Sequence, residues 1–367
     1  MGNLYEEYGL KNTMENKPFS ISFIDSFLDC PYRCFMTYIA GLWPETNGSL
    51  PLVFGSGCHS GLEAMNMSIM HEKRNLCNDC PHECKLLPEV DGTLEPFKRR
   101  LLRKELREKA LDVPIKECAV KRRMLKGFYN EFTESRQNEI FAATKAADPT
   151  KSDEEIRERL KEHEEIAEGC MFDMAFRTQP VGMPVLIEQN LQGVLEGTKI
   201  TGFVDLCLMT DGDTRPEFLL ADYKTASPGK ETEPLRQLSL YVYLVEKMME
   251  AKDEPLKIDF ISALYMIKKK KPAKPRVPFE QTKLKFWDLR KEKDLVDNKI
   301  SEVREDIKQI QECLHKGVFF KNRRSMGCNW CENKALCYNT RLFEQKLEEK
   351  RAKVALEARQ QAQALNE

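Results

Sequence analysis

Two acids and a lysine stand near the ends of two apolar, β-rich runs, 200–210 and 217–226. The acids are Asp205 and Asp222, and Lys224 follows Asp222 by two residues, so both side chains leave a strand on the same face. A carboxylate among apolar residues needs a partner. Mg²⁺ or Mn²⁺ held by two carboxylates satisfies both charges and leaves positions open for phosphate and water. The three residues therefore predict a divalent-metal site for cutting phosphodiester bonds.

Length and composition indicate a globular protein in which any contact with nucleic acid must use local patches. The 367 residues are 41% hydrophobic, enough for a substantial core. Lysine and arginine number 58 against 59 acids, so the chain has no overall basic character. No apolar run approaches the roughly 18 residues that span a bilayer, and the N-terminus lacks a signal-peptide core, which predicts a cytoplasmic protein without membrane contact. In that reducing compartment, the 13 cysteines are better explained by metal ligation than by disulfides.

The chain divides into four regions. Residues 18–70 form an N-terminal helical part with capping residues Ser20 and Ser22, 71–180 a charged helical insertion, 183–275 a core of strands and one helix, and 283–367 a mainly helical C-terminal region. Strands are predicted at 185–191, 199–209, 217–225 and 260–267, with an amphipathic helix at 235–251. This order predicts an α/β fold with a mixed central sheet flanked by helices.

Four elements in sequence order resemble the motifs of the PD-(D/E)xK nuclease superfamily. They are His59, Gly202-Phe203-Val204-Asp205, Asp222-Tyr223-Lys224, and the segment from Gln237 to Tyr241. The two ends of the chain resemble its RecB-like branch with an iron–sulfur cluster, which includes CRISPR-associated RecB-type exonucleases and the nuclease domain of AddB. The insertion at 71–180 lies outside the resemblance. For the rest of the chain, the resemblance implies a restriction-endonuclease-like core.

The resemblance implies a role for each motif residue. Asp205 and Asp222 would be metal ligands, the Tyr223 carbonyl could add an oxygen, and His59 would complete or border the site. Lys224 would orient the attacking water or stabilise the charge that develops on phosphate.

Further residues are expected to support this site. Gln237 and Tyr241 lie four apart on one helical face and could position Lys224 or hold the DNA backbone. Glu188, on the preceding strand, and Glu63 are candidate acids of an outer shell.

A second inorganic site is expected to join the two ends of the chain. By the resemblance, Cys328, Cys331 and Cys337 share a [4Fe–4S] cluster with Cys30 of the N-terminal helix. Cys34, one turn later, could replace Cys30. Four thiolates also make a tetrahedral zinc site, so zinc remains the alternative.

Three cysteines in the insertion form a separate group. Cys77, Cys80 and Cys84 have the spacing of a possible second zinc site, whose alternative is a loop with reduced, unliganded thiols.

These observations predict a metal-dependent deoxyribonuclease. The favoured form is an exonuclease on single-stranded or frayed DNA ends in recombination, repair, phage replication or CRISPR adaptation, working with protein partners of such a complex. The alternatives are a structure-specific endonuclease and a non-catalytic DNA-binding subunit.

Overall fold

The computed structural model divides the chain into two compact units. Unit 1 comprises Met1–Glu45, Gln192–Gly202 and Ser301–Glu367, and unit 2 comprises Thr46–Leu191 and Phe203–Ile300. The structure describes residues 2–43, 50–72, 116, 118–178, 182–211, 214–226, 234–267, 282–292, 294–322, 328, 331 and 333–364.

A mixed six-stranded sheet forms the centre of the fold, as the sequence predicted. Its strands are β1 (Phe19–Ser20), β2 (Met183–Leu195), β3 (Thr198–Asp211), β4 (Pro216–Ala226), β5 (Phe260–Ile267) and β6 (Thr282–Asp288). The order is β1-β3-β4-β5-β6, and β2 also pairs with β3. β3 and β4 are antiparallel, β4 and β5 parallel, and β5 and β6 antiparallel. The four predicted strands are confirmed, whereas β1 and β6 were not predicted.

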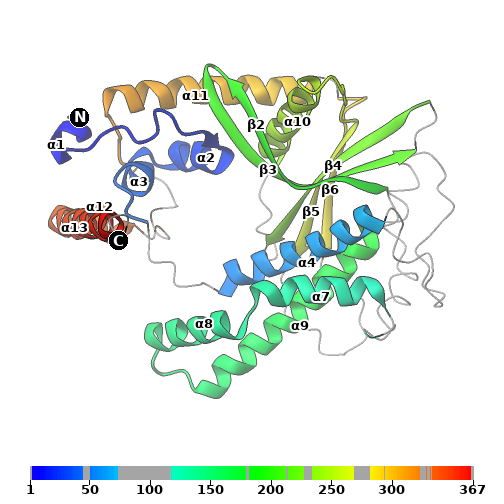
Figure 1. Cartoon of the computed structure of the whole chain (residues 1–367), viewed down its shortest axis with the longest axis horizontal. Helices are drawn as coiled ribbons and strands as arrows, with labels where there is room; N and C mark the ends of the chain where they lie inside the picture. The colour runs from blue at the N-terminus through cyan, green and yellow to red at the C-terminus, as the bar shows by residue number, and fades with distance from the viewer. Residues whose placement is uncertain are drawn as a thin grey trace. The chain divides into compact units, whose positions relative to one another are not determined.

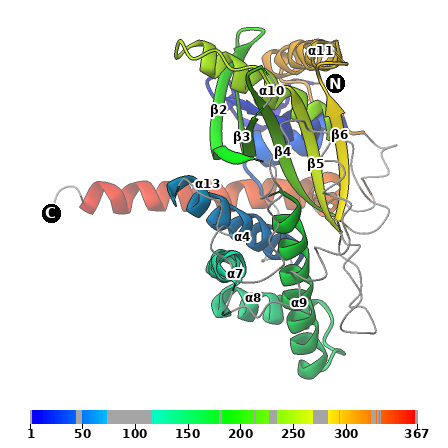
Figure 2. The same ribbon diagram turned by 90° about the vertical axis from the view of Figure 1, so that its right-hand side faces the viewer.

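Helices cover both faces of the sheet in unit 2. They are α4 (Leu50–Glu72), α7 (Ala119–Glu131), α8 (Glu134–Ala147), α9 (Asp153–Thr178) and α10 (Leu235–Glu250). Figures 1 and 2 show α4, α7 and α9 on one side of β4 and β5, with α10 on the other. Leu219, Ala221 and Tyr223 of β4 join the core beneath α4, α7 and α9. Because side chains alternate along a strand, Asp222 and Lys224 point to the opposite face, toward α10.

Unit 1 gathers short N-terminal helices and the C-terminal helices. They are α1 (Leu4–Tyr8), α2 (Ile21–Asp29), α3 (Pro31–Cys34), the π-helix η1 (Phe35–Ile39), most of α11 (Leu295–Lys316), α12 (Lys334–Tyr338) and α13 (Thr340–Ala364). Ser20 caps α2, as predicted, because its hydroxyl accepts the Phe23 N–H at 3.1 Å. Pro31 is the first residue of α3, so Cys30 occupies an extended break between the two helices.

Glycines bring α4 and α7 into close contact beside His59. A Cβ added at Gly127 of α7 would lie 2.3 Å from the Ser60 carbonyl oxygen, and one at Gly61 would lie 2.8 Å from the Met124 carbonyl oxygen. Side chains at these positions would force the helix backbones apart. The small residues therefore fix the distance of α4 from α7 at the turn that carries His59.

A buried hydrogen bond ties α4 to the sheet. The Asn66 amide donates to the Tyr223 hydroxyl at 3.3 Å. Asn66 follows His59 by seven residues, or two helical turns, so both lie on the same face of α4. α4 is thus held by β4 on one side and by α7 on the other.

None of the helices within the described ranges is long and apolar enough to cross a membrane.

Substituting Gly127 tests this helix contact. Gly127→Ala removes a helical glycine, which in an exposed helix stabilises by about 1 kcal/mol. Here the added methyl meets the Ser60 backbone, so we expect a destabilisation of about 1–3 kcal/mol in urea unfolding and weaker Mn²⁺ binding, because α4 shifts. Lys126→Ala, at the exposed neighbouring position, is the control. A Gly127→Ala protein as stable as the wild type would contradict the contact.

Candidate metal centre

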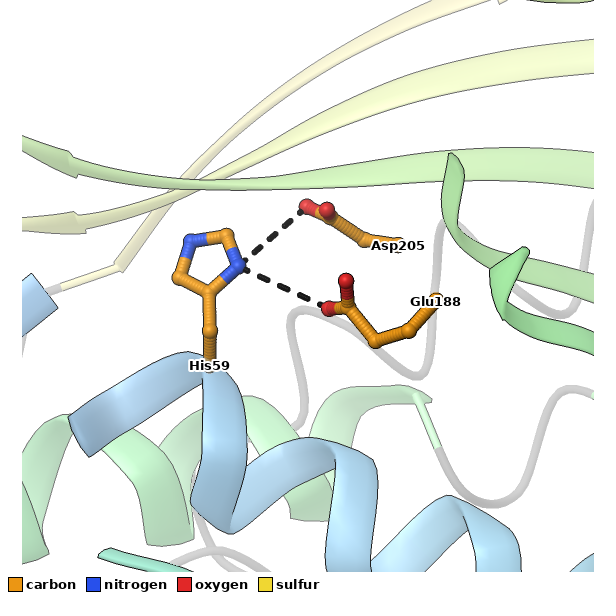
Figure 3. Close-up of side chains that lie close together, drawn as sticks. All are labelled: His59, Glu188 and Asp205. Carbon is orange, nitrogen blue, oxygen red and sulfur yellow. Dashed lines mark ion pairs between the residues drawn. The ribbon is translucent and has the colours of Figure 1, made fainter. Parts of the chain in front are cut away.

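Three donor side chains from different elements converge in unit 2. His59 from α4, Glu188 from β2 and Asp205 from β3 each offer a ligand atom, and these atoms lie within 4.8 Å of one another. His59 Nδ1 is 3.7 Å from Asp205 Oδ2 and 3.9 Å from Glu188 Oε1 (Figure 3). An imidazole and two carboxylates at this spacing are a donor set for a divalent cation.

Asp205 is fixed where the pairing of β3 with β4 ends. The ladder runs from Asp211↔Pro216 to Leu206↔Ala221, although both strands continue. At the next position, the Asp205 carboxylate accepts the Tyr223 N–H at 2.6 Å in place of a backbone carbonyl. The residue is only 8% exposed. A hydrogen bond to a backbone N–H holds one carboxylate oxygen in place beside His59.

Glu188 reaches this group through an unusual backbone conformation. Its φ is 44°, in the left-handed region, although it is a non-glycine residue within β2. Such a conformation costs on the order of 1–3 kcal/mol and is concentrated at functional sites. The sequence predicted Glu188 as an outer-shell acid; the structure instead places its carboxylate among the three converging donors.

Asp222 is a buried acid paired with Lys224. It is 2% exposed, and Lys224 donates to its Oδ1 at 3.2 Å. Lys224 Nζ also lies 2.9 Å from Oδ2, but this buried oxygen accepts no hydrogen bond from the described residues. The ammonium of Lys224 thus already offsets part of the buried charge of Asp222. Asp222 is not one of the three donors whose atoms lie within 4.8 Å of one another, although its charge raises the pKa of Asp205. The role of Asp222 as a metal ligand therefore stays a prediction.

Burial disfavours the charged form of both acids, and a neighbouring carboxylate adds to this effect at each of them. Desolvation, and then the charge of Asp222, raise the pKa of Asp205 to about 7. The pKa of Asp222 is also raised, chiefly by burial, although Lys224 opposes the shift. Two carboxylates in this position need positive charge nearby in order to ionise together.

His59 supplies part of that charge when no cation is bound. Burial alone lowers the pKa of the imidazole, but the carboxylates of Glu188 and Asp205 outweigh it, and the net pKa is above the usual value. A proton on His59 and a divalent cation would compete for the same negative surroundings. The donor set thus fits a metal ion.

Lys224 is held by a chain of hydrogen bonds from α10. It donates to Gln237 Oε1 at 2.7 Å, and Gln237 Nε2 donates to the Tyr241 hydroxyl at 2.7 Å. Gln237 and Tyr241 share one face of α10, as predicted. Burial raises the pKa of Tyr241, so its phenol stays protonated. The ammonium is therefore fixed beside Asp222 by neutral groups that leave its charge in place.

Two further residues were predicted for this site, Tyr223 and Glu63. The Tyr223 side chain lies on the opposite face from Lys224 and contacts Asn66, while its N–H binds Asp205. Glu63 is one turn after His59 and is not one of the three converging donors. Burial, and then the charge of Glu188, raise the pKa of Glu63, which places it beside the group.

Four thiols of unit 1 line a cavity. Cys30, Cys328, Cys331 and Cys337 surround it together with Arg33 and Lys334. Cys34 lies in the hydrophobic core instead, where burial raises the pKa of its thiol. After burial, the charges of the neighbouring cysteines raise the pKa of Cys337, as expected for thiols gathered in one place. Such a set of free thiols fits a thiolate-ligated metal group.

Hydrogen bonds hold the two ends of the chain at this cavity. Asn322 donates to the Asp29 carbonyl at 2.9 Å, and the Tyr32 N–H donates to the Phe320 carbonyl at 3.1 Å. Lys321 donates to the Cys337 carbonyl at 2.7 Å. Protein contacts alone therefore bring Cys30 to the C-terminal cysteines.

The predicted zinc ligands Cys77, Cys80 and Cys84 lie outside the described residues.

Removing one buried charge is expected to stabilise the metal-free protein. Asp205→Asn keeps an oxygen for the Tyr223 N–H but removes the repulsion, so in EDTA at pH 8 its unfolding free energy should exceed that of the wild type by a few kcal/mol. Folded Asp205 titrates near pH 7 and unfolded aspartate near about 3.9, so the folded state binds more protons between these values. Metal-free wild type therefore loses stability as the pH rises through this interval, and the difference should be small at pH 4.

Urea unfolding at both pH values measures this effect. Asp253→Asn, an exposed acid whose left-handed backbone also suits asparagine, is the control. Mn²⁺ should stabilise the wild type and not the Asp205→Asn variant. A variant less stable than the wild type at pH 8 would contradict the electrostatic argument.

Comparison with known proteins agrees with this geometry. The family model of the PD-(D/E)XK nuclease superfamily matches residues 18–338. A search of curated proteins finds no match. The family match spans the converging acids, Lys224 and the four cysteines that line the cavity of unit 1. The chain belongs to the PD-(D/E)XK nuclease superfamily.

Proposed function

We propose that this protein is a metal-dependent deoxyribonuclease whose cation is held by Asp205, Asp222, His59 and Glu188. The observation that carries the proposal is the convergence of three ligand atoms within 4.8 Å of one another. The buried carboxylate of Asp222, which is paired with Lys224, is near enough to raise the pKa of Asp205. Oxygen donors with one imidazole suit Mg²⁺ and Mn²⁺. Such a cation supplies charge neutralisation and lowers the pKa of water during phosphodiester hydrolysis.

The residues around the cation would position the reactants. Lys224, fixed by Gln237 and Asp222, presents its ammonium on the same sheet face as the acids. There it can orient the attacking water or donate to a phosphate oxygen as negative charge develops. The neutral Gln237–Tyr241 pair restricts the lysine without neutralising it. The Tyr223 carbonyl, beside the N–H that Asp205 binds, would add an oxygen to the site.

The favoured substrate is a DNA end, single-stranded or frayed, in recombination, repair, phage replication or CRISPR adaptation. A structure-specific endonuclease would use the same residues and differ in how the substrate is led to them. A non-catalytic DNA-binding subunit would not need Lys224 held beside paired acids, so the intact set supports the enzyme.

We propose that Cys30, Cys328, Cys331 and Cys337 hold a [4Fe–4S] cluster. The four free cysteines line one cavity, as either a zinc ion or a cluster would require. The resemblance of the two ends of the chain to the iron–sulfur branch supports the cluster over a single zinc ion. When bound, the cluster supplies a covalent link between the two ends of the chain.

Cleavage of labelled DNA tests the nuclease. With Mg²⁺ or Mn²⁺, the wild type should degrade end-labelled linear single strands and leave single-stranded circles intact. Asp222→Asn and Lys224→Ala should each reduce the rate by about 100-fold or more, since each removes charge stabilisation of the transition state. Asp253→Asn and Lys252→Ala, which change exposed residues, are the matched controls. Cutting of circles would favour the endonuclease, and equal rates for wild type and site variants would overturn the assignment.

Metal analysis tests the cluster. Anaerobically purified protein should be brown and contain about four irons and four sulfides per chain. Cys331→Ser should lose the iron and the colour, whereas Cys313→Ser, which changes a part-buried cysteine outside the cavity, should keep both. A colourless protein with one zinc per chain would favour the zinc alternative.

A further inference from the structure

A large apolar side chain is exposed beside the metal centre. Phe203 is 54% exposed, whereas Val204, Leu206 and Leu208 on the same strand are buried. Phe203 precedes Asp205 by two residues, so both side chains leave β3 on the same face, about 7 Å apart along the strand. Phe203 therefore lies on the face of the sheet that carries the converging donors.

The described part of unit 2 leaves this ring uncovered. On β2, the residues after Glu188, which are Gln189 and Asn190, are also exposed. No aromatic contact joins the Phe203 ring to another described side chain, unlike Tyr223, whose ring meets the His59 imidazole edge-on at 6.0 Å. Fully burying a phenylalanine contributes about 1.5–3 kcal/mol, and the fold gains only part of this from Phe203, because more than half of the residue is exposed.

We propose that Phe203 stacks on an unpaired base of the strand whose phosphate lies at the metal centre. This inference rests on the proposed nuclease function and specifies its substrate. A phosphate held at Asp205 leaves its attached base within reach of a ring about 7 Å along the strand. Stacking on an aromatic side chain is a sequence-tolerant way to bind single strands, since every base has an aromatic face.

This contact selects against paired DNA. Within a duplex, the faces of each base are covered by its neighbours, so a base must be unstacked before Phe203 can meet it. Strand ends, frayed ends and single strands provide such bases at little cost. Phe203 therefore favours these substrates, whereas the three converging donors would be occupied by the cation.

Variants of Phe203 separate stacking from simple apolar contact. Phe203→Ala should weaken binding of a single-stranded oligonucleotide about 5- to 100-fold, seen as a higher KM with little change in kcat. Phe203→Trp and Phe203→Tyr should retain wild-type binding, whereas Phe203→Leu, which is apolar without an aromatic ring, should behave like the alanine variant. Leu52→Ala, at an exposed leucine of α4 in the same unit, should have no effect. Thermal melting should show all variants folded, because the side chain is exposed.

A binding measurement without cleavage gives a second readout. With Ca²⁺ in place of Mg²⁺, oligonucleotides carrying 2-aminopurine at each position in turn should show one position whose fluorescence is quenched by the wild type and not by Phe203→Ala. Removing that base to leave an abasic site should make the two proteins bind equally. A Phe203→Ala protein that binds and cuts every substrate like the wild type, or a leucine variant equal to tryptophan, would overturn the inference. A wild type that neither binds nor cuts DNA would instead overturn the proposed function and this inference with it.

Discussion

The hydrogen bond from the Tyr223 N–H to Asp205 is the interaction on which the site depends. It lies where the β3–β4 ladder ends, so a carboxylate takes the position of a backbone acceptor. In the same part of β4, the Lys224 side chain points to the sheet face that α10 covers, and the Tyr223 side chain points to the face that α4 covers. One point of the sheet thereby fixes an acid, a lysine and the helix that carries His59. The repulsion between buried acids at this point is the cost that a cation relieves.

The helix that carries the imidazole is positioned by packing. Glycine contacts set the distance between α4 and α7, and the Asn66 hydrogen bond sets the position of α4 along β4. Both constraints act within a few residues of His59. A shift of about 1 Å in a ligand is enough to impair catalysis, so the close-packed helices serve the metal centre as directly as the ligands do.

Period-two alternation allowed the strands of the sheet to be predicted, and it indicated candidate site residues on them. Asp205, Asp222 and Lys224 interrupt apolar strands, and Gln237 and Tyr241 are spaced for one helical face. The position of Glu188 among the donors was not predictable, because it depends on a left-handed φ that no local pattern indicates for glutamate. Its place at the end of an apolar run was the available signal. β6 was not predicted, although Leu284 and Phe286 alternate with lysines, because the whole of 283–367 was assigned as a mainly helical region.

The arrangement of unit 1 explains why a metal group there would affect stability more than chemistry. Asn322 and Asp29, which are 293 residues apart, are already joined by a hydrogen bond, and Asn333 contacts Thr37 in the same way. These bonds order the cavity before any metal binds, so little further entropy is lost when thiolates are linked. A link between distant residues chiefly restricts the unfolded chain, and its stabilising effect grows only slowly with the length of the loop it closes. A metal group held by these four thiols would therefore join the ends of the chain and stabilise the fold, whereas the buried carboxylates of unit 2 lower the stability of the metal-free protein.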